Sequence, residues 1–455
     1  MKPFAMTLLS EAIARYHRIL EDFAKAGSPW ISELHAQLER RGLTANGRPL
    51  SPILRPHFIT RRQYETLAAA AEALSSAICR VRDLALREPA LMARLGLLPG
   101  ERMLVSLDPG YSIPAVASLL EASVVNGHLH LAAPRADLPR GAVFSELLGE
   151  AFLETPPMKE FRKRHRISRP PGVKPLASSL LRAWKDFGGK GKPNVAILTF
   201  PSGVATADSR EDALLAGFLH SQGFLAEIVS PDELEYQGGL LRRGDFRIDM
   251  ILRGVRAQDL LTRYDLAHPL LRACRERRVC LVNSFRAEVM RKRALFALLT
   301  DDSVTGSFPA AERKAIRETI PPTRLVAQGK TTWQGETVDL IDFILKNRSQ
   351  LVLRPNEDSS ELHSTDGALV DDAAWERAVR LALRHPYVVQ QRVESPVFPF
   401  PLDYFGELTY RDMTVEVAPH AFLGKVHGFS ARLSAPGGGF SSAAGLVPAF
   451  ILESK

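Results

Sequence analysis

Apolar side chains recur along the N-terminal part of the chain at the spacing of amphipathic helices. Residues 11–24 and 61–86 carry them every three or four positions, which gathers them on one helical face. In the second stretch this face is formed by Leu67, Ala71, Leu74 and Ile78. We therefore expect a helical region over residues 1–100.

Strands are predicted where this period is lost. An apolar run at 103–107 stops at an Asp-Pro-Gly turn, and another at 128–132 follows an Asn-Gly pair, so both are predicted to be buried strands. Over residues 167–192 the composition shifts to RPPGVKP and GGKGKPN around one short helix, expected at 176–187. We interpret 167–192 as a linker between domains.

Strands and helices then alternate over residues 193–290. Continuous apolar runs predict strands at 195–200, 226–229, 249–253 and 279–282. Helices are expected between them at 209–222, with Ser209 as its N-cap, and at 269–278. This alternation favours a parallel, Rossmann-like sheet whose ligand edge lies at the carboxyl ends of its strands.

Three polar side chains follow these strands and are expected at that edge. They are Ser202, Arg253 and Asn283. We predict Arg253 and Asn283 as substrate-binding residues, with Arg253 holding a carboxylate; a surface ion pair is the alternative for Arg253. A basic helix is expected to follow Asn283, up to residue 300.

The final third of the chain has a more antiparallel α+β pattern. Strands are expected at 324–326, 350–354, 387–393 and 414–417, and helices at 337–346 and 373–383.

Composition narrows the function classes only slightly. The net charge is +8 and the pI about 9.4. However, basic and acidic residues are interspersed, and they lack the interleaved aromatic side chains of a surface that binds single-stranded nucleic acid. Nucleic-acid binding therefore ranks last. The three cysteines lack paired spacing, and Glu11 interrupts the N-terminal apolar stretch, so we expect a cytoplasmic protein without disulfides or a membrane span.

Several segments carry a family resemblance in their order along the chain. They are GRPLSPILRPHFIT, LVSLDPGY, IDMILRGV, PLLRACRERRVCLVNSFRAEVMRKRALFALL, IPPTRLV, LVLRP, YVVQQRV, and GFSARLS followed by PGGGFSS. Together they resemble the circularly permuted ATP-grasp family, which includes the synthetase half of glutathionylspermidine synthase.

The resemblance implies a mixed α/β and α+β fold in five parts. Residues 1–100 would form the helical region and 101–166 a permuted segment of the metal-binding lobe. The linker 167–192 would lead to a pre-ATP-grasp domain at 193–290, and 291–455 would form the ATP-grasp lid and C-terminal lobe. Active relatives use ATP and magnesium to phosphorylate a carboxylate, and an amine then displaces phosphate to give an amide.

The metal-ligand positions implied by the resemblance have lost their usual residues. The family has two short metal-ligand motifs in this region. The first would fall on residues 116–118, which end in Ser118. The second would fall on 133–135, with Ala133 and Arg135 at the ligand positions. We therefore predict no metal site, although a shifted register would recruit Glu121 and Asp137 instead.

The phosphate-binding positions have changed as well. Arg293 and Arg354 stand where the family has lysines, and a planar guanidinium does not replace a compact ammonium in a tight site. The glycine-rich loop is replaced by NEDSSELHSTDG, whose carboxylates Glu357, Asp358 and Glu361 would repel a triphosphate.

Other matched positions retain residue types that are compatible with nucleotide or anion binding. Gln390 and Gln391 lie in the segment expected to contact adenine, with a strand core as the alternative. Arg432 and 437–439 match an anion-binding C-terminal segment, where a hairpin turn explains the glycines equally well. Arg135, Arg293 and Arg354 complete the nucleotide or anion-binding candidates.

Two hypotheses follow. The first is an ATP-grasp-like pseudoenzyme without a cofactor, acting as a binding or regulatory partner of a paralogous active ligase. The second is an active ATP- and magnesium-dependent ligase that joins a small-molecule carboxylate to an amine.

Overall fold

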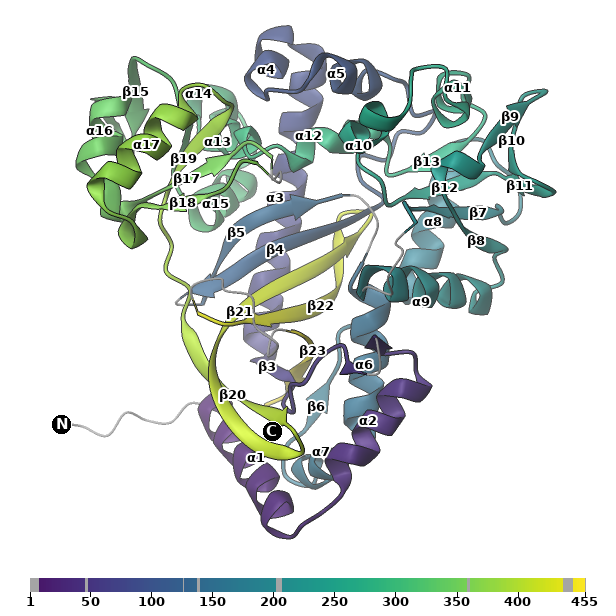
Figure 1. Ribbon diagram of the computed structural model, residues 1–455, viewed down its shortest axis with the longest axis vertical. Coiled ribbons are helices and arrows are strands. Elements are labelled where there is room, and N and C mark those ends of the chain that lie inside the picture. Colours follow the sequence, from purple (N-terminus) through teal and green to yellow (C-terminus); the bar gives the residue numbers. More distant parts are fainter. Residues whose placement is uncertain are drawn as a thin grey trace.

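The computed structural model describes residues 8–45, 48–125, 127–136, 140–201, 207–357, 361–436 and 445–454. A central, mainly antiparallel sheet lies between two α/β lobes and a helical base (Figure 1).

The central sheet combines strands from both ends of the chain. Its eight strands include the path β3-β23-β22-β21-β4-β5, with β20 on β21 and β6 on β23. Their bounds are β3 His57–Thr60, β4 Ala117–Val125, β5 His128–Arg135, β6 Ile167–Ser168, β20 Val397–Tyr404, β21 Glu407–Phe422, β22 Lys425–Ser434 and β23 Gly445–Leu452. The predicted strand at 128–132 is thus confirmed. The predicted segments 101–166 and 291–455 share this sheet; the circular permutation and the five-part division stay predictions.

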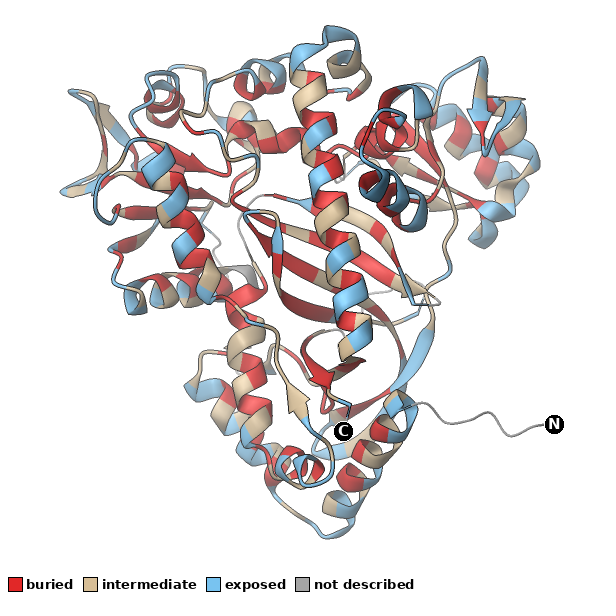
Figure 2. Cartoon of the chain, turned by 180° about the vertical axis from the view of Figure 1, so that it is seen from behind, coloured by how far each residue is buried: buried red, intermediate tan, exposed pale blue. Residues whose placement is uncertain are grey.

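One long helix, α3 (Arg61–Arg87), covers one face of this sheet (Figure 2). Thr60 begins it with a capping box: the Thr60 hydroxyl accepts from the Gln63 N–H, and the Gln63 side chain accepts from the Thr60 N–H. The predicted apolar face of α3 packs on alternate strand residues such as Val415 and Val417. Because strand side chains alternate between faces, Glu416 points away from α3.

The predicted parallel unit is confirmed. The strands β7 (Val195–Leu198), β8 (Ala226–Val229), β12 (Met250–Arg253) and β13 (Cys280–Val282) form a sheet in the order β13-β12-β7-β8, with parallel pairing throughout. Around them lie α8 Lys174–Asp186, α9 Ala207–Ser221, α10 Ala257–Arg263, α11 Pro269–Arg275 and the small sheet β9 Glu235–Gln237, β10 Leu240–Arg243 and β11 Phe246–Ile248. Ser209 lies inside α9, so its prediction as an N-cap is wrong.

The second lobe is a four-stranded sheet in the order β14-β19-β17-β18. Its elements are β14 Thr323–Leu325, β17 Leu351–Pro355, β18 Thr365–Asp366, β19 Tyr387–Gln391, α13 Ala294–Leu299, α14 Asp302–Thr305, α15 Ala310–Thr319, α16 Leu340–Lys346 and α17 Asp372–Ala382. A hairpin of β15 (Lys330–Trp333) and β16 (Glu336–Asp339) precedes α16. The helix predicted from residue 337 is therefore wrong in its first part, because Asp339 caps α16 by accepting from the Asp342 N–H at 3.3 Å.

The base consists of α1 (Leu8–Lys25), α2 (Trp30–Arg40), α6 (Ala142–Glu154) and α7 (Pro156–Arg162), and a short turn holds β1 (Thr44–Ala45) and β2 (Arg48–Pro49). Two further helices, α4 (Pro89–Arg94) and α5 (Pro99–Val105), lie beyond the end of α3. The strand predicted at 103–107 is wrong, because Pro99 and Glu101, which accepts from the Leu98 N–H at 2.8 Å, begin α5 instead.

The predicted basic helix after Asn283 is broken into short pieces, a 3₁₀ turn at Phe285–Ala287, α12 (Glu288–Arg291) and α13. Asn283 itself joins the parallel sheet to the central sheet. Its side chain accepts from the Val116 N–H at 2.7 Å and donates to Ala117 O at 2.6 Å and Ala136 O at 2.8 Å.

Replacing Asn283 with alanine should destabilise the fold by about 3 kcal/mol or more, because three buried backbone groups lose their partner. Urea unfolding followed by circular dichroism measures this loss. Asn347→Ala is the matched control, since it removes one hydrogen bond, to Phe343 O, at a half-buried helix end, and should cost about 1 kcal/mol. Equal losses in the two variants would contradict the joining role of Asn283.

Candidate functional site

Polar side chains gather on the face of the central sheet opposite α3. They line a cavity of about 240 Å³ between β4, β5, β21 and β22. Glu416 and Arg432 are directly paired across β21 and β22, and Arg135 lies opposite Leu119 across β4 and β5. Arg135 Nε is 2.7 Å from Glu121 Oε1. Strand pairing therefore brings two carboxylates and two guanidinium groups to one cavity.

Charges around this cavity act on Glu416. Burial and the nearby charge of Glu121 raise the pKa of Glu416, while Arg432, Arg354 and Arg135 oppose that rise. Three of the sequence-predicted anion-binding candidates thus converge on one carboxylate. Arg354 also donates from Nη1 to Gln390 Oε1 at 3.1 Å.

A smaller cavity of about 40 Å³ adjoins residues 133–135 and is strongly basic. It is lined by Ala133, Pro134, Arg135, Arg256, Arg291, Lys292, Arg293, Phe296 and Glu357. Lys292 is only 4% exposed, and its Nζ donates to Glu101 Oε1 at 2.8 Å and to Glu357 Oε2. Burial alone would lower the pKa of Lys292, but Glu357 and Glu101 outweigh burial and raise it.

Glu357 is the anion of this basic cluster. Besides its contact with Lys292, its Oε1 lies 3.8 Å from Arg256 Nη1 and 3.9 Å from Arg291 Nε. Glu357 follows Arg354 by three residues, at the start of the segment that replaces the glycine-rich loop. The protein's own carboxylate therefore lies among cations where the resemblance implies a phosphate.

Arg293 has structural contacts in the same region. Its Nη1 donates to Pro355 O and its N–H to Asn356 O, both at 2.9 Å. Asn356 in turn accepts from the Ala294 N–H and donates to Leu95 O, both at 2.8 Å. These bonds fix α13 against the end of β17. A role for Arg293 in anion binding stays a prediction.

The predicted adenine segment at the end of β19 is engaged within the protein. Gln390 is 5% exposed and donates to Thr323 Oγ1 at 2.9 Å, and Gln391 accepts from Gln334 at 3.0 Å. The N–H groups of Gln391 and Arg392 donate to Pro322 O and Gln350 O.

The two predicted substrate-binding residues are buried. Arg253 is 0% exposed; it forms an ion pair with Glu288 and donates to Val255 O at 2.8 Å and Asn283 O at 3.1 Å. Its ion pair is therefore internal and not on the surface. Asn283 is 2% exposed, and its side chain holds the backbone of residues 116, 117 and 136.

The expected metal-ligand positions do not face one cavity. Ala133 and Arg135 line the basic cavity, whereas Ser118 lies on the α3 side of the sheet, next to Cys79 in a different cavity. Among the described residues, no group of three or more His, Cys, Asp or Glu side chains is placed to hold a metal ion. Ser202, Asp137, Asp358 and residues 437–439 lie outside the part of the chain that the structure describes.

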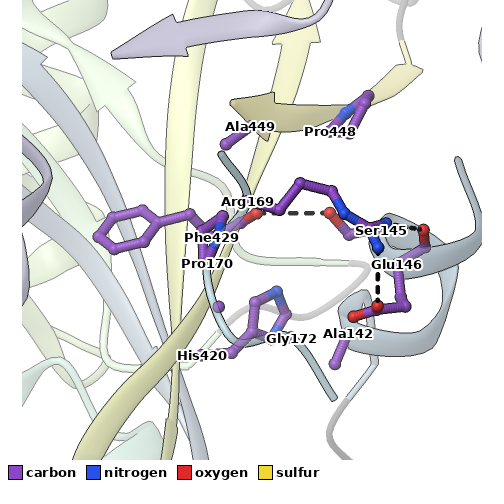
Figure 3. Close-up of a pocket in the computed structure, with 11 residues that line it drawn as sticks. Ala142, Ser145, Glu146, Arg169, Pro170, Gly172, His420, Phe429, Pro448 and Ala449 are labelled. Atoms are coloured by element: carbon purple, nitrogen blue, oxygen red, sulfur yellow. Dashed lines mark hydrogen bonds and ion pairs between the residues drawn. The ribbon is translucent and has the colours of Figure 1, made fainter. Parts of the chain in front are cut away.

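A third, small cavity lies beside the first, where residues of α6, β21, β22 and β23 meet (Figure 3). Its volume of about 30 Å³ holds about one water molecule. Arg169 Nη2 lies 3.5 Å from Glu146 Oε1 in its wall, and a Cβ on Gly172 would lie 1.8 Å from Glu146 Oε2. His420, buried beside it, is hydrogen-bonded to Ser430 at 3.0 Å. This cavity is a packing feature and no cofactor site.

Sequence reasoning missed Lys292 and Glu416. Lys292 directly precedes Arg293 in RKRALF, so a one-residue shift of the family register would have found it. Glu416 interrupts the apolar alternation of TVEVA, and a charged residue between buried strand positions marks a polar face of a sheet.

The arrangement of the described elements is similar to that of a solved structure. A solved structure of a glutathione synthetase-like effector, GSS30 from Globodera pallida in its apo form, matches with a TM-score of 0.59 and 13% identity, over 93% of this chain and 96% of that chain. At this identity the likeness concerns the fold alone.

Two further solved structures are similar at lower scores. A putative gamma-glutamylcysteine synthetase from Methylobacillus flagellatus has a TM-score of 0.43 at 12% identity, over 86% of this chain and 87% of that chain. The ATP-grasp ligase PsnB, complexed with a minimal precursor, has a TM-score of 0.27 at 11% identity, over 58% of this chain and 90% of that chain. Neither score carries an argument about this chain.

No protein-family model and no curated protein sequence matches the chain. Within the described ranges, no helix has the length and apolar character needed to cross a membrane.

Lys292→Met should lower the free energy of unfolding by about 3–5 kcal/mol, because it leaves the Glu101 carboxylate buried without its cation. Urea unfolding measures the loss. Lys425→Met is the matched control, since Lys425 also pairs with a glutamate, Glu72 at 2.7 Å, but its side chain is 70% exposed; the control should lose less than about 1 kcal/mol. A Lys292 variant as stable as the control would contradict the buried pairing.

His420→Gln should reduce the loss of stability in acid. Burial lowers the pKa of His420 from 6.5 to about 4, so below about pH 6.5 the unfolded chain takes up a proton that the folded chain refuses. Stability is lost as pH falls through this window, by up to about 3 kcal/mol.

Urea unfolding of wild type and His420→Gln between about pH 7 and pH 4 measures this difference. The variant should gain on wild type as the pH falls. A residual acid slope is expected, because burial also lowers the pKa values of His17 and His57 to about 4. Parallel stability curves would refute the assignment.

Proposed function

We propose that this ATP-grasp-like protein has lost magnesium and triphosphate binding and acts as a binding or regulatory partner of an active ligase. The observation that carries the proposal is the position of Glu357 between Lys292, Arg256 and Arg291. A phosphate at this place would have to displace a carboxylate that already neutralises the cations.

The neighbouring Glu101 strengthens this argument. Lys292 lies between two carboxylates, Glu101 and Glu357, so its charge is already balanced within the fold. A triphosphate carries several negative charges and would meet both carboxylates in a buried setting, where like charges repel most strongly.

The donor set does not fit magnesium. Mg²⁺ favours carboxylate oxygens in octahedral geometry together with substrate phosphates. Of the three carboxylates that line the cavity between β4, β5, β21 and β22, Glu121 is paired with Arg135 at 2.7 Å and Glu211 accepts from the Gly141 N–H. Burial together with the charge of Glu121 raises the pKa of Glu416, which favours its neutral form. Arg135 itself stands at an expected ligand position and would repel a cation.

The adenine segment supports the same proposal. A nucleotide base is commonly held by backbone N–H and C=O groups at the wall of its pocket. The N–H groups of Gln391 and Arg392 are already donated to the protein's own carbonyls.

A second candidate function is an active carboxylate–amine ligase, favoured by Arg135 and Arg432, which line one cavity, and by Arg354, whose charge also acts on Glu416. In such a reaction the γ-phosphoryl group of ATP passes to a carboxylate, giving ADP and an acylphosphate. An amine then attacks the acyl carbon, loses a proton and displaces phosphate. The three guanidinium groups would stabilise the charge that develops on the phosphoryl oxygens.

Calorimetric titration of the purified chain with ATP, with and without magnesium, separates the two candidates. We expect no micromolar binding in either condition, and no release of ADP when carboxylates and amines are supplied. Magnesium-dependent micromolar binding that Arg354→Ala weakens about tenfold or more, as expected for a lost charge-assisted contact, would establish the ligase instead. Arg384→Ala is the control variant, because Arg384 is exposed and lines neither cavity.

A further inference from the structure

A cavity of about 860 Å³ lies on the α3 side of the central sheet, away from the candidate site. It is lined by α3, the start of α15, residues 113–115 and the turn between β21 and β22, and it opens to solvent. Figure 2 shows α3 crossing this face of the sheet. The volume falls in the range of about 300–1,000 Å³ that is typical of small-molecule sites.

Ion pairs and hydrogen bonds fix the walls of this cavity to α3. Glu312 ties α15 to α3, accepting from Ser76 Oγ at 2.8 Å and from Arg80 Nε and Nη2 at 2.9 Å. Glu72 ties the β21–β22 turn to α3, accepting from Lys425 Nζ at 2.7 Å and the Val426 N–H at 3.0 Å. Two walls of the cavity are therefore fixed to the same helix.

The walls are mainly apolar, and most charges in them are balanced within the protein. The apolar and small residues include Ala69, Ala73, Ile113, Pro114, Met290 and Leu423. Glu72 and Glu312 are neutralised by Lys425 and Arg80. Arg182 of α8 also lines the cavity and is exposed, so an acidic group of a ligand can meet a guanidinium there while remaining partly solvated.

We infer that this cavity is a second ligand site, for a small organic molecule with an apolar body and a single acidic group. The body would pack on Ala69, Ala73 and Leu423, and the acidic group would face Arg182. The inference does not depend on the proposed function, because none of its lining residues belongs to the two cavities of the candidate site.

The two faces of β4 connect this cavity to the candidate site. Ser118 lines the ligand cavity, whereas Leu119 and Glu121 line the cavity with Glu416. Successive side chains of one strand point to opposite faces. A molecule bound behind the sheet therefore contacts the same strand that places Glu121 beside Arg135.

Two fluorescent probes that differ by one acidic group test the inference on the full chain. The probes are 8-anilinonaphthalene-1-sulfonate, which is anionic, and N-phenyl-1-naphthylamine, its neutral counterpart. We expect both to bind wild type saturably at one site. Ala73→Trp, which fills the cavity from α3, should abolish both, and Arg182→Ala should weaken only the anionic probe, by about fivefold, as expected for one exposed charge contact.

Glu65→Trp is the control, because Glu65 is an exposed residue of α3 that does not line the cavity; it should bind both probes as wild type does. Near-ultraviolet circular dichroism checks that each variant keeps its tertiary packing. If Ala73→Trp loses that packing, Ala69→Trp, at an exposed position of the same wall, replaces it.

Iodoacetamide labelling of Cys79 gives an independent readout. Cys79 lines the cavity and is partly exposed, whereas Cys274 and Cys280 are buried. Either bound probe should slow its labelling. Unsaturable binding, or equal binding by folded Ala73→Trp and wild type, would overturn the site. Equal weakening of both probes by Arg182→Ala would overturn the assignment of the acidic group.

Discussion

The side chain of Asn283 is the contact on which the arrangement of the two sheets depends. Apolar residues of the two sheets pack in one core, with Val282 of the parallel sheet beside Ala117 and Phe422 of the central sheet. The Asn283 amide adds one accepted and two donated hydrogen bonds between their backbones. An amide carries both a carbonyl oxygen and N–H donors, which these three partners require. The positions of β4 and β5 relative to the α/β lobe, and therefore the walls of the candidate site, follow from this bridge.

Around this junction the protein buries several charges in internally balanced groups. Arg253 with Glu288, and Lys292 with Glu101 and Glu357, are all largely withdrawn from solvent. Burying such groups costs desolvation energy, and removing one partner of a buried pair strongly destabilises the fold. The cations of this region are held in place, but carboxylates of the protein already neutralise their charge. The likeness to a glutathione synthetase-like effector concerns the arrangement of elements, and the chemistry of these side chains is the chain's own.

The sequence predicted those features that depend on local pattern. The four parallel strands were found because apolar runs such as VAIL and MILR are bounded by turn signals, and α3 because its period is unbroken over 27 residues. The prediction of a strand at 103–107 is wrong because an apolar run alone does not distinguish a short helix from a strand. The prediction of one continuous helix after Asn283 is wrong for a different reason. The helix breaks at Lys292, whose partner Glu101 is 191 residues away in the sequence, and a local pattern does not reveal such a contact.

The candidate site was predictable only in part. The family resemblance singled out Arg135, Arg354 and Arg432, and the charges of all three act on Glu416; their role in anion binding stays a prediction. Glu416 could not be placed beside them without the register of β21 against β22 and β4, and Ser118 was placed with Arg135 although the pleat of β4 sends it to the other face. Pairings between distant strands are set by tertiary contacts that a local pattern does not contain.

The joining of β3, β4 and β5 to β21, β22 and β23 has a consequence for the order in which the protein forms during synthesis. The strands of the α/β lobe leave the ribosome close together, between residues 195 and 282, and can pair at once. The early strands β3 to β5 must wait for residues 407–452 before the central sheet can close. Throughout that interval the nascent chain exposes an open strand edge and the apolar face of α3, which are the kinds of surface on which non-native association begins.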